Sequence, residues 1–353
     1  MASSKLRILA LMGVSLGALG GLYLAAWPVP IEPVAWQAPP GVEWHPTGSL
    51  ASAQRVPMAD GYGPEDVHVL PSGDVIVGSH DGTLWRHGDE VSVVTDGLER
   101  PLGIHGLPDG RLVVADALLG LVAVDVDTGA VEVLTTTCGG APLVFTDDVD
   151  VAADGTIWFT DATQRFQQSD WMMDILESGA TGRLCSYQIG DVDAQEHLTE
   201  VAFANGIALD PAGAFVLVNE TSRYRVRRLW LSGPNEGTDD VFVDDLPGFP
   251  DGISAGDGVF WIAIASPRNG AVDTLAGHPW LRKVLVRLPE VMLPAPLQSA
   301  RAIALDASGA VVHDLYDPVG ERITTVTSVQ EHDGRVYLGS LVDTAWAVID
   351  IPD

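Results

Sequence analysis

The chain has 353 residues, of which 46% are hydrophobic, so it can bury one large core or two ordinary domains. Its 48 acidic residues outnumber 19 Lys and Arg, which leaves a formal net charge of −29 at pH 7. The electrostatic field of such a negative net charge repels phosphate backbones, so nucleic acid is not expected as a partner. The same field attracts divalent cations. The acidity is equally compatible with a role in solubility alone.

The first 27 residues predict a membrane anchor. Lys5 and Arg7 precede an uncharged run from Ile8 to Trp27, about the length that spans a bilayer as a helix. Basic residues before the run and none soon after it place the N-terminus in the cytoplasm and the remainder on the extracytoplasmic side, whether periplasmic, lumenal or extracellular. A cleaved signal peptide is the alternative, although the run is long and ends in a poor cleavage site. Residues 28–54 are Pro-rich and predict an extended linker.

Residues 55–353 predict a six-bladed β-propeller. Six copies of a strand–turn–strand unit follow one another, and each turn contains a glycine that can adopt the positive φ of a tight hairpin. Regular repetition of such hairpins favours a propeller over a sandwich. A further turn at Ala307–Gly309 is interpreted as an outer hairpin of blade five or six, with seven blades as the alternative. One helix is expected near Ser169–Ser178, over a mouth of the tunnel. The strands after the six turns are expected at 75–78, 112–115, 157–160, 215–218, 260–263 and 336–339.

The repeat brings oxygen-bearing residues into one register. Counting back eight residues from the turn glycines, or seven from Gly258, reaches the start of each innermost strand. Equivalent positions there surround one mouth of the tunnel, so their side chains are expected to converge. The positions are Glu65, Leu102, Asp147, Asn205, Asp251 and Val326.

Four of these six positions, Glu65, Asp147, Asn205 and Asp251, predict a metal site. Carboxylates forced together repel one another unless a cation or protons neutralise them. An all-oxygen set without His or Cys favours a hard cation, and a roomy ring fits calcium better than magnesium. Each residue alone is ordinary loop chemistry, and it is the shared register that indicates a site.

Seven stretches carry a family resemblance: 100–103 (RPLG), 114–120 (VADALLG), 148–161 (DVDVAADGTIWFTD), 203–209 (FANGIAL), 220–225 (ETSRYR), 246–252 (LPGFPDG) and 331–334 (EHDG). Together they resemble the strictosidine synthase-like family, over about residues 55–351. Within the wider superfamily of gluconolactonases, regucalcin-like proteins and paraoxonases, the resemblance implies a calcium-dependent lactone or ester hydrolase on a six-bladed propeller. It also implies that the metal ligands are the four residues of the ring.

Two departures from the resemblance limit the chemistry. The catalytic Glu of true strictosidine synthases falls at Thr327, which cannot act as a general acid or base. The Pictet–Spengler condensation of those enzymes is therefore not expected here. A paraoxonase-type catalytic His falls at Leu102. The expected hydrolase would therefore use a ring carboxylate to activate water, with Asp251 as first candidate and Asp147 as second. A non-catalytic, membrane-anchored binding propeller with a structural calcium is the alternative.

Other polar and reactive residues are expected to be structural. His105 is expected to face away from the tunnel and Asp148 to point into its blade. Cys138 and Cys185 are compatible with one disulfide or with two buried thiols. Substrate choice is expected to depend on the loops Gln164–Gly179 and Ser266–Trp280. Blade hydrogen bonds are expected for Glu220, Arg223 and Tyr224, and blade packing for Trp158, Trp230, Trp261 and Trp346.

Overall fold

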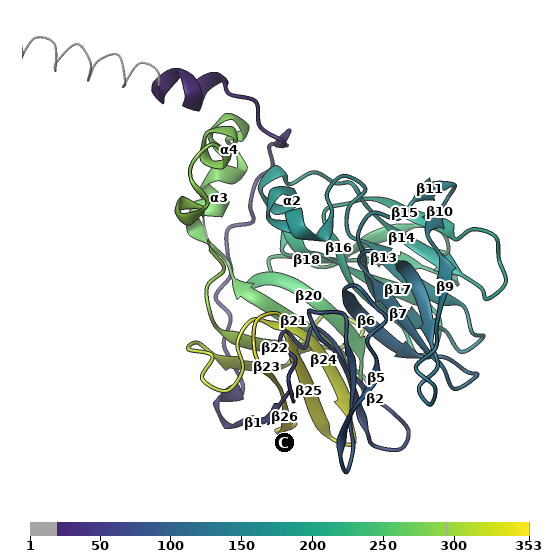
Figure 1. Ribbon diagram of the computed structural model, residues 1–353. Coiled ribbons are helices and arrows are strands. Elements are labelled where there is room, and N and C mark those ends of the chain that lie inside the picture. Colours follow the sequence, from purple (N-terminus) through teal and green to yellow (C-terminus); the bar gives the residue numbers. More distant parts are fainter. Residues whose placement is uncertain (1–19, 294, 353) are drawn as a thin grey trace, which may run out of the picture.

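The computed structural model of the protein describes residues 20–293 and 295–352. Residues 20–26 form a short helix that leads away from the propeller (Figure 1). Residues 8–19, which are most of the predicted anchor, lie outside the described residues. Within the described part of the chain, no helix combines the length and the hydropathy that a membrane span requires.

Six four-stranded antiparallel sheets form the propeller. Five of them are consecutive in sequence, with the first strand innermost. They comprise β2 (Val67–Val69), β3 (Val75–Gly78), β4 (Leu84–His87) and β5 (Val91–Thr95); β6 (Pro101–Gly106), β7 (Leu112–Asp116), β8 (Gly120–Val124) and β9 (Val131–Thr135); β12 (Thr146–Val151), β13 (Ile157–Asp161), β14 (Gly182–Tyr187) and β15 (Gln195–Val201); β16 (Ala204–Leu209), β17 (Phe215–Glu220), β18 (Arg225–Trp230) and β19 (Asp239–Val243); and β20 (Gly248–Ala255), β21 (Phe260–Pro267), β22 (Ala300–Leu305) and β23 (Val311–Asp317).

The sixth sheet closes the ring with strands from both ends of the chain. It contains β24 (Val326–His332), β25 (Arg335–Ser340), β26 (Ala345–Asp350) and, outermost, β1 (Gln54–Pro57). The six innermost strands contact one another in order, and β24 returns to β2. The predicted six-bladed fold is therefore confirmed. The extra turn at Ala307–Gly309 joins β22 to β23 and is the outer hairpin of blade five.

The second strand of each blade is buried on both faces, which explains its continuous apolar sequence. All residues of β3, β7, β13 and β17 are buried, because neighbouring blades cover the two sides of each sheet. Complete burial of one Leu, Ile or Phe side chain stabilises the fold by roughly 1.5–3 kcal/mol. The six runs predicted from the repeat all fall within these second strands.

A β-bulge interrupts the pairing of five innermost strands at the same place. In β12, Asp147 and Asp148 lie between the pairs Thr146↔Asp161 and Val149↔Phe159. Equivalent register shifts occur in β6, β16, β20 and β24. A bulge bends the strand and redirects a side chain. The first residues of the bulges are Leu102, Asp147, Asn205, Asp251 and Thr327, and Glu65 takes this place just before β2.

Glycine follows the first bulge residue in three blades, because the next innermost strand passes very close. A Cβ at Gly103 would lie 2.5 Å from the Asp148 carboxylate, and one at Gly252 would lie 2.5 Å from the Thr327 carbonyl oxygen. A Cβ at Gly206 would collide with the Asp251 carbonyl oxygen. The bulges therefore also set how tightly the blades close around the tunnel.

Blade three carries the disulfide. Cys138, in the hairpin of β10 (Thr137–Cys138) and β11 (Ala141–Pro142), is bonded to Cys185 of β14, with a Cα–Cα distance of 6.4 Å. Arg183 lies beside it and donates a hydrogen bond to the Cys138 carbonyl oxygen at 2.8 Å. Of the two states compatible with the sequence, the structure has the disulfide.

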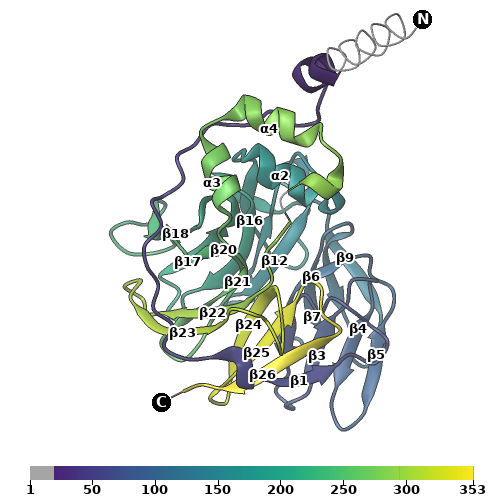
Figure 2. The same ribbon diagram turned by 90° about the vertical axis from the view of Figure 1, so that its left-hand side faces the viewer.

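Three helices cover one mouth of the tunnel and form a lid (Figure 2). They are α2 (Trp171–Glu177), α3 (Gly270–Ala276) and α4 (Pro279–Val286), and α4 is followed by a turn at Glu290–Met292. The helix predicted near Ser169–Ser178 is thus confirmed as α2, whereas α3 and α4 were not predicted. A short turn, Gln168–Asp170, precedes α2, and two others lie at Leu50–Ser52 and Thr221–Arg223.

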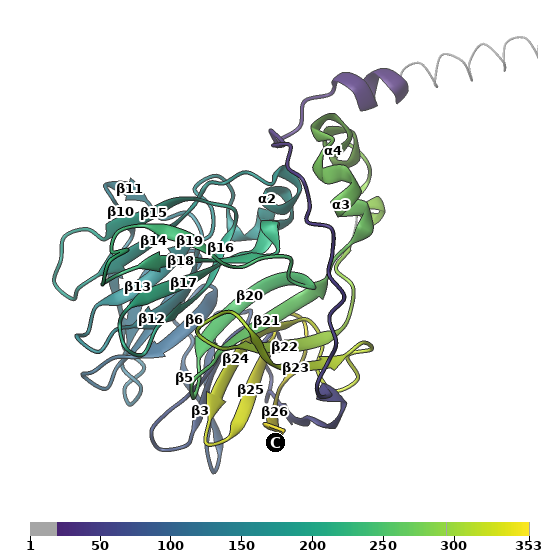
Figure 3. The same cartoon turned by 180° about the vertical axis from the view of Figure 1, so that it is seen from behind.

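The segment between the N-terminal helix and β1 runs along the outside of the lid and the propeller as a strap, defined as residues 27–53 (Figure 3). Ile31 of the strap is 1% exposed. The Val34 N–H donates to the Glu177 carbonyl oxygen at 2.9 Å, and the Trp36 N–H donates to Ala276 at 3.1 Å. The Pro-rich segment therefore holds α2 and α3 in place.

Candidate functional site

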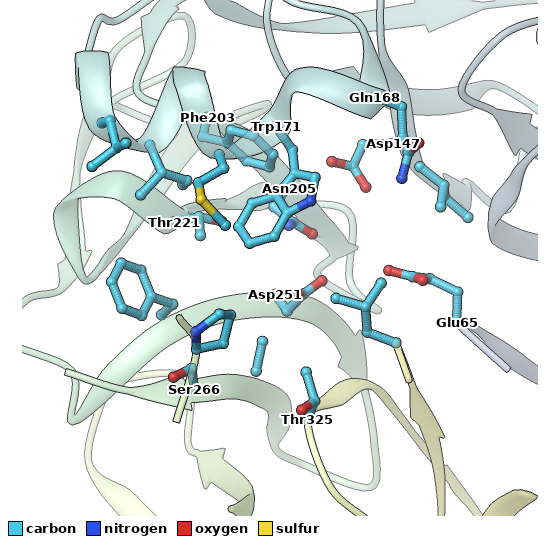
Figure 4. A pocket seen from close by; sticks show the side chains of 18 of the residues that line it. Glu65, Asp147, Gln168, Trp171, Phe203, Asn205, Thr221, Asp251, Ser266 and Thr325 are labelled. Carbon is cyan, nitrogen blue, oxygen red and sulfur yellow. The ribbon is translucent and has the colours of Figure 1, made fainter. Parts of the chain in front are cut away.

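The four predicted ligands lie together at the covered mouth of the tunnel. Glu65, Asp147, Asn205 and Asp251 come from four different blades, and Figure 4 shows their side chains directed into one space below Trp171. All four line both the cavity under the lid and the tunnel beneath it. The bulges place them there, because each is the first residue of its bulge or its equivalent.

Hydrogen bonds between blades fix the backbone of these residues. The Thr160 hydroxyl donates to the Asn205 carbonyl oxygen at 2.8 Å, and the Asn219 amide donates to that of Asp251. The Thr327 hydroxyl donates to the Glu65 carbonyl oxygen at 2.7 Å. Such partners hold the side chains in a preorganised arrangement, which metal and catalytic sites require.

Glu65 carries a basic partner that the sequence did not reveal. Arg100 Nη2 lies 2.5 Å from Glu65 Oε2, and the Arg100 side chain is 3% exposed. Among the residues that the structure describes, the other two nitrogens of this guanidinium have no hydrogen-bond partner. Arg100 belongs to the RPLG stretch at the start of blade two, which carries part of the family resemblance. The sequence did not predict that its charge would lie beside the ring.

Asp147 is a buried and Asp251 a half-buried carboxyl group, and neither has such a partner among the described residues. Burial raises the pKa of Asp147 well above its usual range, and the nearby carboxylate of Asp251 adds to this rise. Burial likewise raises the pKa of Asp251, and Glu65 adds to it, while a hydrogen bond from Asn205 acts in the opposite direction. Within residues 20–293 and 295–352, neither carboxylate forms an ion pair. In this arrangement a bound cation would compensate charge that is otherwise costly.

The donor set fits a hard cation, with one qualification. Carboxylate and amide oxygens are the ligands that calcium prefers. Among the residues that the structure describes, however, no three His, Cys, Asp or Glu side chains are grouped as they would be around a metal ion. The Glu65 carboxylate is instead paired with Arg100, and the fourth donor is the amide of Asn205.

The cavity above the ring is mostly apolar. Trp171, Met172, Ile175 and Leu176 of α2 form one wall. Much of the remaining wall consists of the aromatic rings of Phe145, Phe203 and Phe249 and of Val272 from α3. Both loops expected to choose the substrate contribute to this wall. Trp171 was not singled out from the sequence, although its place at the start of the predicted helix could have indicated it.

Two expectations for the tunnel below the ring are wrong. His105 lines the tunnel, with its Nε2 atom 3.3 Å from Asp150 Oδ1. Asp148 also lines it and accepts a hydrogen bond from the Ile207 N–H of the next blade at 2.9 Å. Both expectations assumed regular strand alternation, which the bulges interrupt. Asp66 is the equivalent of Asp148 and accepts from the Ile104 N–H at 2.7 Å.

Blade six requires a further correction. Val326 was placed in the ring by the eight-residue count, but it is fully buried in the apolar core. The first bulge residue is Thr327, which lines the tunnel. The hairpin here has two turn residues, Asp333 and Gly334, between the paired His332 and Arg335. A count from the glycine must therefore be one residue shorter, as it is for Gly258. Thr327 is also the position that the resemblance assigned to the missing catalytic Glu.

The residues expected to form blade hydrogen bonds, Glu220, Arg223 and Tyr224, do form hydrogen bonds, and two of them reach the lid. Arg223 Nη2 donates to the Ser178 carbonyl oxygen at 2.7 Å, and the Tyr224 hydroxyl donates to Asp273 of α3 at 2.8 Å. The Ala202 N–H donates to the Glu220 carboxylate at 2.9 Å. None of these side chains takes part in the ring.

Comparison with known proteins supports the fold and the predicted family resemblance. The family model for strictosidine synthase matches residues 147–234, and that for the N-terminal part of strictosidine synthase-like proteins matches residues 43–87. Protein strictosidine synthase-like 10 of Arabidopsis thaliana is 34% identical over 331 residues, which cover 85% of this chain and 88% of that protein. The chain belongs to the strictosidine synthase-like family. The adipocyte plasma membrane-associated protein of Salmo salar is 35% identical over 347 residues, 90% of this chain and 83% of the relative.

Solved structures of other propellers share the fold at low identity. A gluconolactonase from Xanthomonas campestris superposes with a TM-score of 0.63 at 15% identity, covering 90% of this chain and 99% of that chain. A calcium-binding protein, regucalcin, from Agrobacterium tumefaciens gives 0.57 at 15% identity, covering 84% and 93%. At these identities the likeness concerns the fold. For this member of the strictosidine synthase-like family, the chemistry must be argued from its own residues.

Proposed function

We propose that the protein is a calcium-dependent hydrolase of lactones or esters. The observation that carries this proposal is the position of Asp147, Asn205 and Asp251 at the base of an apolar cavity under a helical lid. The gluconolactonase and regucalcin among the similar folds support the same reaction class and the same metal. Glu65, Asp147, Asn205 and Asp251 would hold the ion, and Glu65 would join the set by exchanging Arg100 for it.

The apolar cavity binds the organic part of the substrate and excludes water from it. Trp171 and Phe203 line it above the ring, so the carbonyl group of a bound ester would lie next to a cation held by the ring. Calcium bound there would supply positive charge for the oxygen on which negative charge develops.

Asp251 is the first candidate for the general base. It accepts a proton from the attacking water while the water oxygen bonds to the carbonyl carbon. The C–O bond to the leaving alkoxide then breaks, and the proton passes to that oxygen, giving a carboxylic acid and an alcohol. Asp147 is the second candidate, and it faces the same space (Figure 4). Leu102 and Thr327 occupy the ring positions where the resemblance places a catalytic histidine and glutamate.

We also propose that the apolar run from Ile8 to Trp27 anchors the protein in a membrane, with the propeller on the extracytoplasmic side. The basic residues before the run and the membrane association stated in the name of the salmon relative support the anchor. The Cys138–Cys185 disulfide supports an oxidising compartment for the propeller.

The full-length chain, purified in detergent, tests the proposed reaction. Truncation at residue 41 would cut the strap, so the intact chain is preferred. Hydrolysis of phenyl acetate and of a panel of lactones is measured with calcium, after chelation and after calcium is restored. Activity that disappears and returns supports the proposal. The absence of turnover under all three conditions contradicts it.

The alternative function is a non-catalytic binding propeller with a structural calcium. The pairing of Glu65 with Arg100 and the residues Leu102 and Thr327 favour it, because they reduce the polar groups available for catalysis. This function predicts a fall of the melting temperature on chelation without any ester hydrolysis. The same experiment therefore separates the two.

A further inference from the structure

Helix α4 and the described segment that follows it carry four exposed large apolar side chains. Trp280 of α4 is 65% exposed, and Val291, Met292 and Leu297 in the segment after α4 are 91%, 58% and 50% exposed. Large apolar side chains grouped on a surface mark an interaction site. Figures 1 and 2 place α4 at the outer edge of the lid, beside the N-terminal helix and away from the blades.

Residues 274–289, which include α4, carry a net charge opposite in sign to that of the whole chain. Between Asp273 and Glu290 the sequence has no acidic residue, but it has Arg282, Lys283 and Arg287. Lys283 and Arg287 lie with Trp280 along a hollow between α4 and residues 21–25. A tryptophan beside basic side chains is typical of a protein surface that contacts lipid headgroups, and it suits anionic lipid.

The end of the proposed anchor is attached to the same helix. Arg287 Nε donates to the Trp27 carbonyl oxygen at 2.6 Å, and its Nη1 donates to that of Leu24 at 3.0 Å. An apolar run that enters a bilayer from this point starts at the surface of α4. The chain therefore holds α4 within reach of the headgroups.

The same segment forms part of the cavity entrance. Ala295 and Pro296 line the cavity above the ring, between the exposed Met292 and Leu297. Val272 of α3 and Trp171 of α2 line the same cavity. A surface that contacts α4 and residues 291–293 and 295–297 would thus lie next to the entrance.

We propose that α4 and residues 291–293 and 295–297 dock on the bilayer surface, so that the cavity takes its ligand from the lipid phase. The proposal rests on the membrane anchor but not on hydrolysis. A ligand that enters this way carries a large apolar group, which matches the aromatic and aliphatic wall above the ring. A second copy of the chain on this surface is the competing occupant, and the test separates the two.

The test uses the full-length chain in vesicles of phosphatidylcholine, with or without phosphatidylserine. Single cysteines replace Trp280 or Val291 and carry an environment-sensitive fluorophore, while the native cysteines remain in their disulfide. Val192→Cys is the matched control. It is 99% exposed and follows Tyr187, which pairs with Ile157 at the end of blade three opposite the ring. Flotation with the vesicles reports on the anchor, and quenching by spin-labelled lipid reports on docking.

Docking predicts severalfold stronger quenching at positions 280 and 291 than at position 192. Lys283→Glu should reduce this quenching more in vesicles that contain phosphatidylserine. Protein that floats but is quenched equally at all three positions overturns the docking proposal and leaves the anchor intact. Protein that does not float overturns both. If the fluorophores at positions 280 and 291 are shielded from water in lipid-free detergent, and more so at higher protein concentration, a second copy of the chain is the occupant. This result also overturns the proposal. Ester hydrolysis enters none of these measurements.

Discussion

Arg100 Nη2 lies 2.5 Å from Glu65 Oε2 and places a buried positive charge at the edge of the ring. A calcium ion bound at the ring would compete with this ion pair for the Glu65 carboxylate. Arg100→Met should leave the Glu65 carboxylate unpaired and destabilise the chelated protein by about 3 kcal/mol. The calcium-induced rise in melting temperature should be larger in this variant than in the parent.

Arg86→Met is the matched control for Arg100→Met. Arg86 also forms a 2.5 Å ion pair, with Asp74, but its side chain is 35% exposed. Loss of an exposed pair changes stability by no more than about 1 kcal/mol. Calorimetry with and without chelator measures both variants. Weaker calcium binding in Arg100→Met would contradict the competition.

Asp251→Asn should separate the cost of the buried carboxyl group from its use. In the metal-free protein the raised pKa of Asp251 stabilises the fold below the ordinary pKa, and this stabilisation is lost as the pH rises through the raised value. The variant should therefore be more stable than the parent in chelator at pH 8, with a smaller difference near pH 4. Calcium should stabilise it less than it stabilises the parent.

Asp257→Asn, in the exposed turn of the same hairpin, is the control for that series. It should follow the parent at each pH and with calcium. Urea unfolding at three pH values gives the free energies for both variants. Equal calcium stabilisation of Asp251→Asn and the parent would remove Asp251 from the ligand set.

The lid helix α2 should loosen as the pH rises towards 8. Burial raises the pKa of Asp174 to about 7. Stability from the neutral carboxyl group is complete below the ordinary pKa of 3.8 and is lost as the pH rises through about 7. Hydrogen exchange in α2, corrected for its intrinsic pH dependence, should show this loss. Asp174→Asn should abolish it, whereas the exposed Asp170→Asn should retain it. A pH-independent lid in the parent would contradict this expectation.

Arg282 should hold the strap and the lid together. Its guanidinium donates to the carbonyl oxygens of Leu176, Glu177, Ala276 and Val34. Arg282→Met removes one donor from each of these carbonyl oxygens, although those of Glu177 and Ala276 keep the N–H donors of Val34 and Trp36. The loss costs about 1–3 kcal/mol for each acceptor left without another partner and out of reach of water. We expect faster amide exchange in residues 31–36 and in α2, with the blades unchanged. The neighbouring Lys283→Met is the control, and equal exchange in the two variants would show that the ties are dispensable.

The disulfide should stabilise blade three against unfolding. It closes a loop of 47 residues in sequence, for which loop-closure entropy gives about 4 kcal/mol. Replacing both Cys138 and Cys185 with Ala should lower the melting temperature, and a reducing agent should then have no further effect. The parent should lose a similar amount of stability on reduction. An unchanged melting temperature after verified reduction would contradict the estimate.

The propeller and the ring were predictable because both repeat. Each hairpin has its own glycine turn and apolar second strand, so six weak local signals support one another. The strap and helices α3 and α4 occur once, and Gly277, His278 and Pro279 divide the helical segment into pieces too short to stand out. Arg100 was missed for a related reason, since a single charge in the sequence does not reveal the carboxylate that it will meet.

The errors within the site have a common physical origin. His105, Asp148 and Val326 were placed by strict alternation or by a fixed count. A bulge adds one residue to a strand, and a two-residue turn removes one from a hairpin. Either change moves a side chain to the other face. Neither has a strong sequence signature in this chain.

The repeated bulge has an evolutionary consequence. Each first bulge residue is held by the backbone pairs on either side of it, so the side chain itself contributes little to keeping the strand in place. Selection can therefore exchange the six side chains one at a time while the blades persist. Introducing His at position 102 or Glu at position 327 would alter the reactive groups without altering the scaffold. One architecture can in this way acquire, lose and regain activities through single substitutions at six interchangeable places.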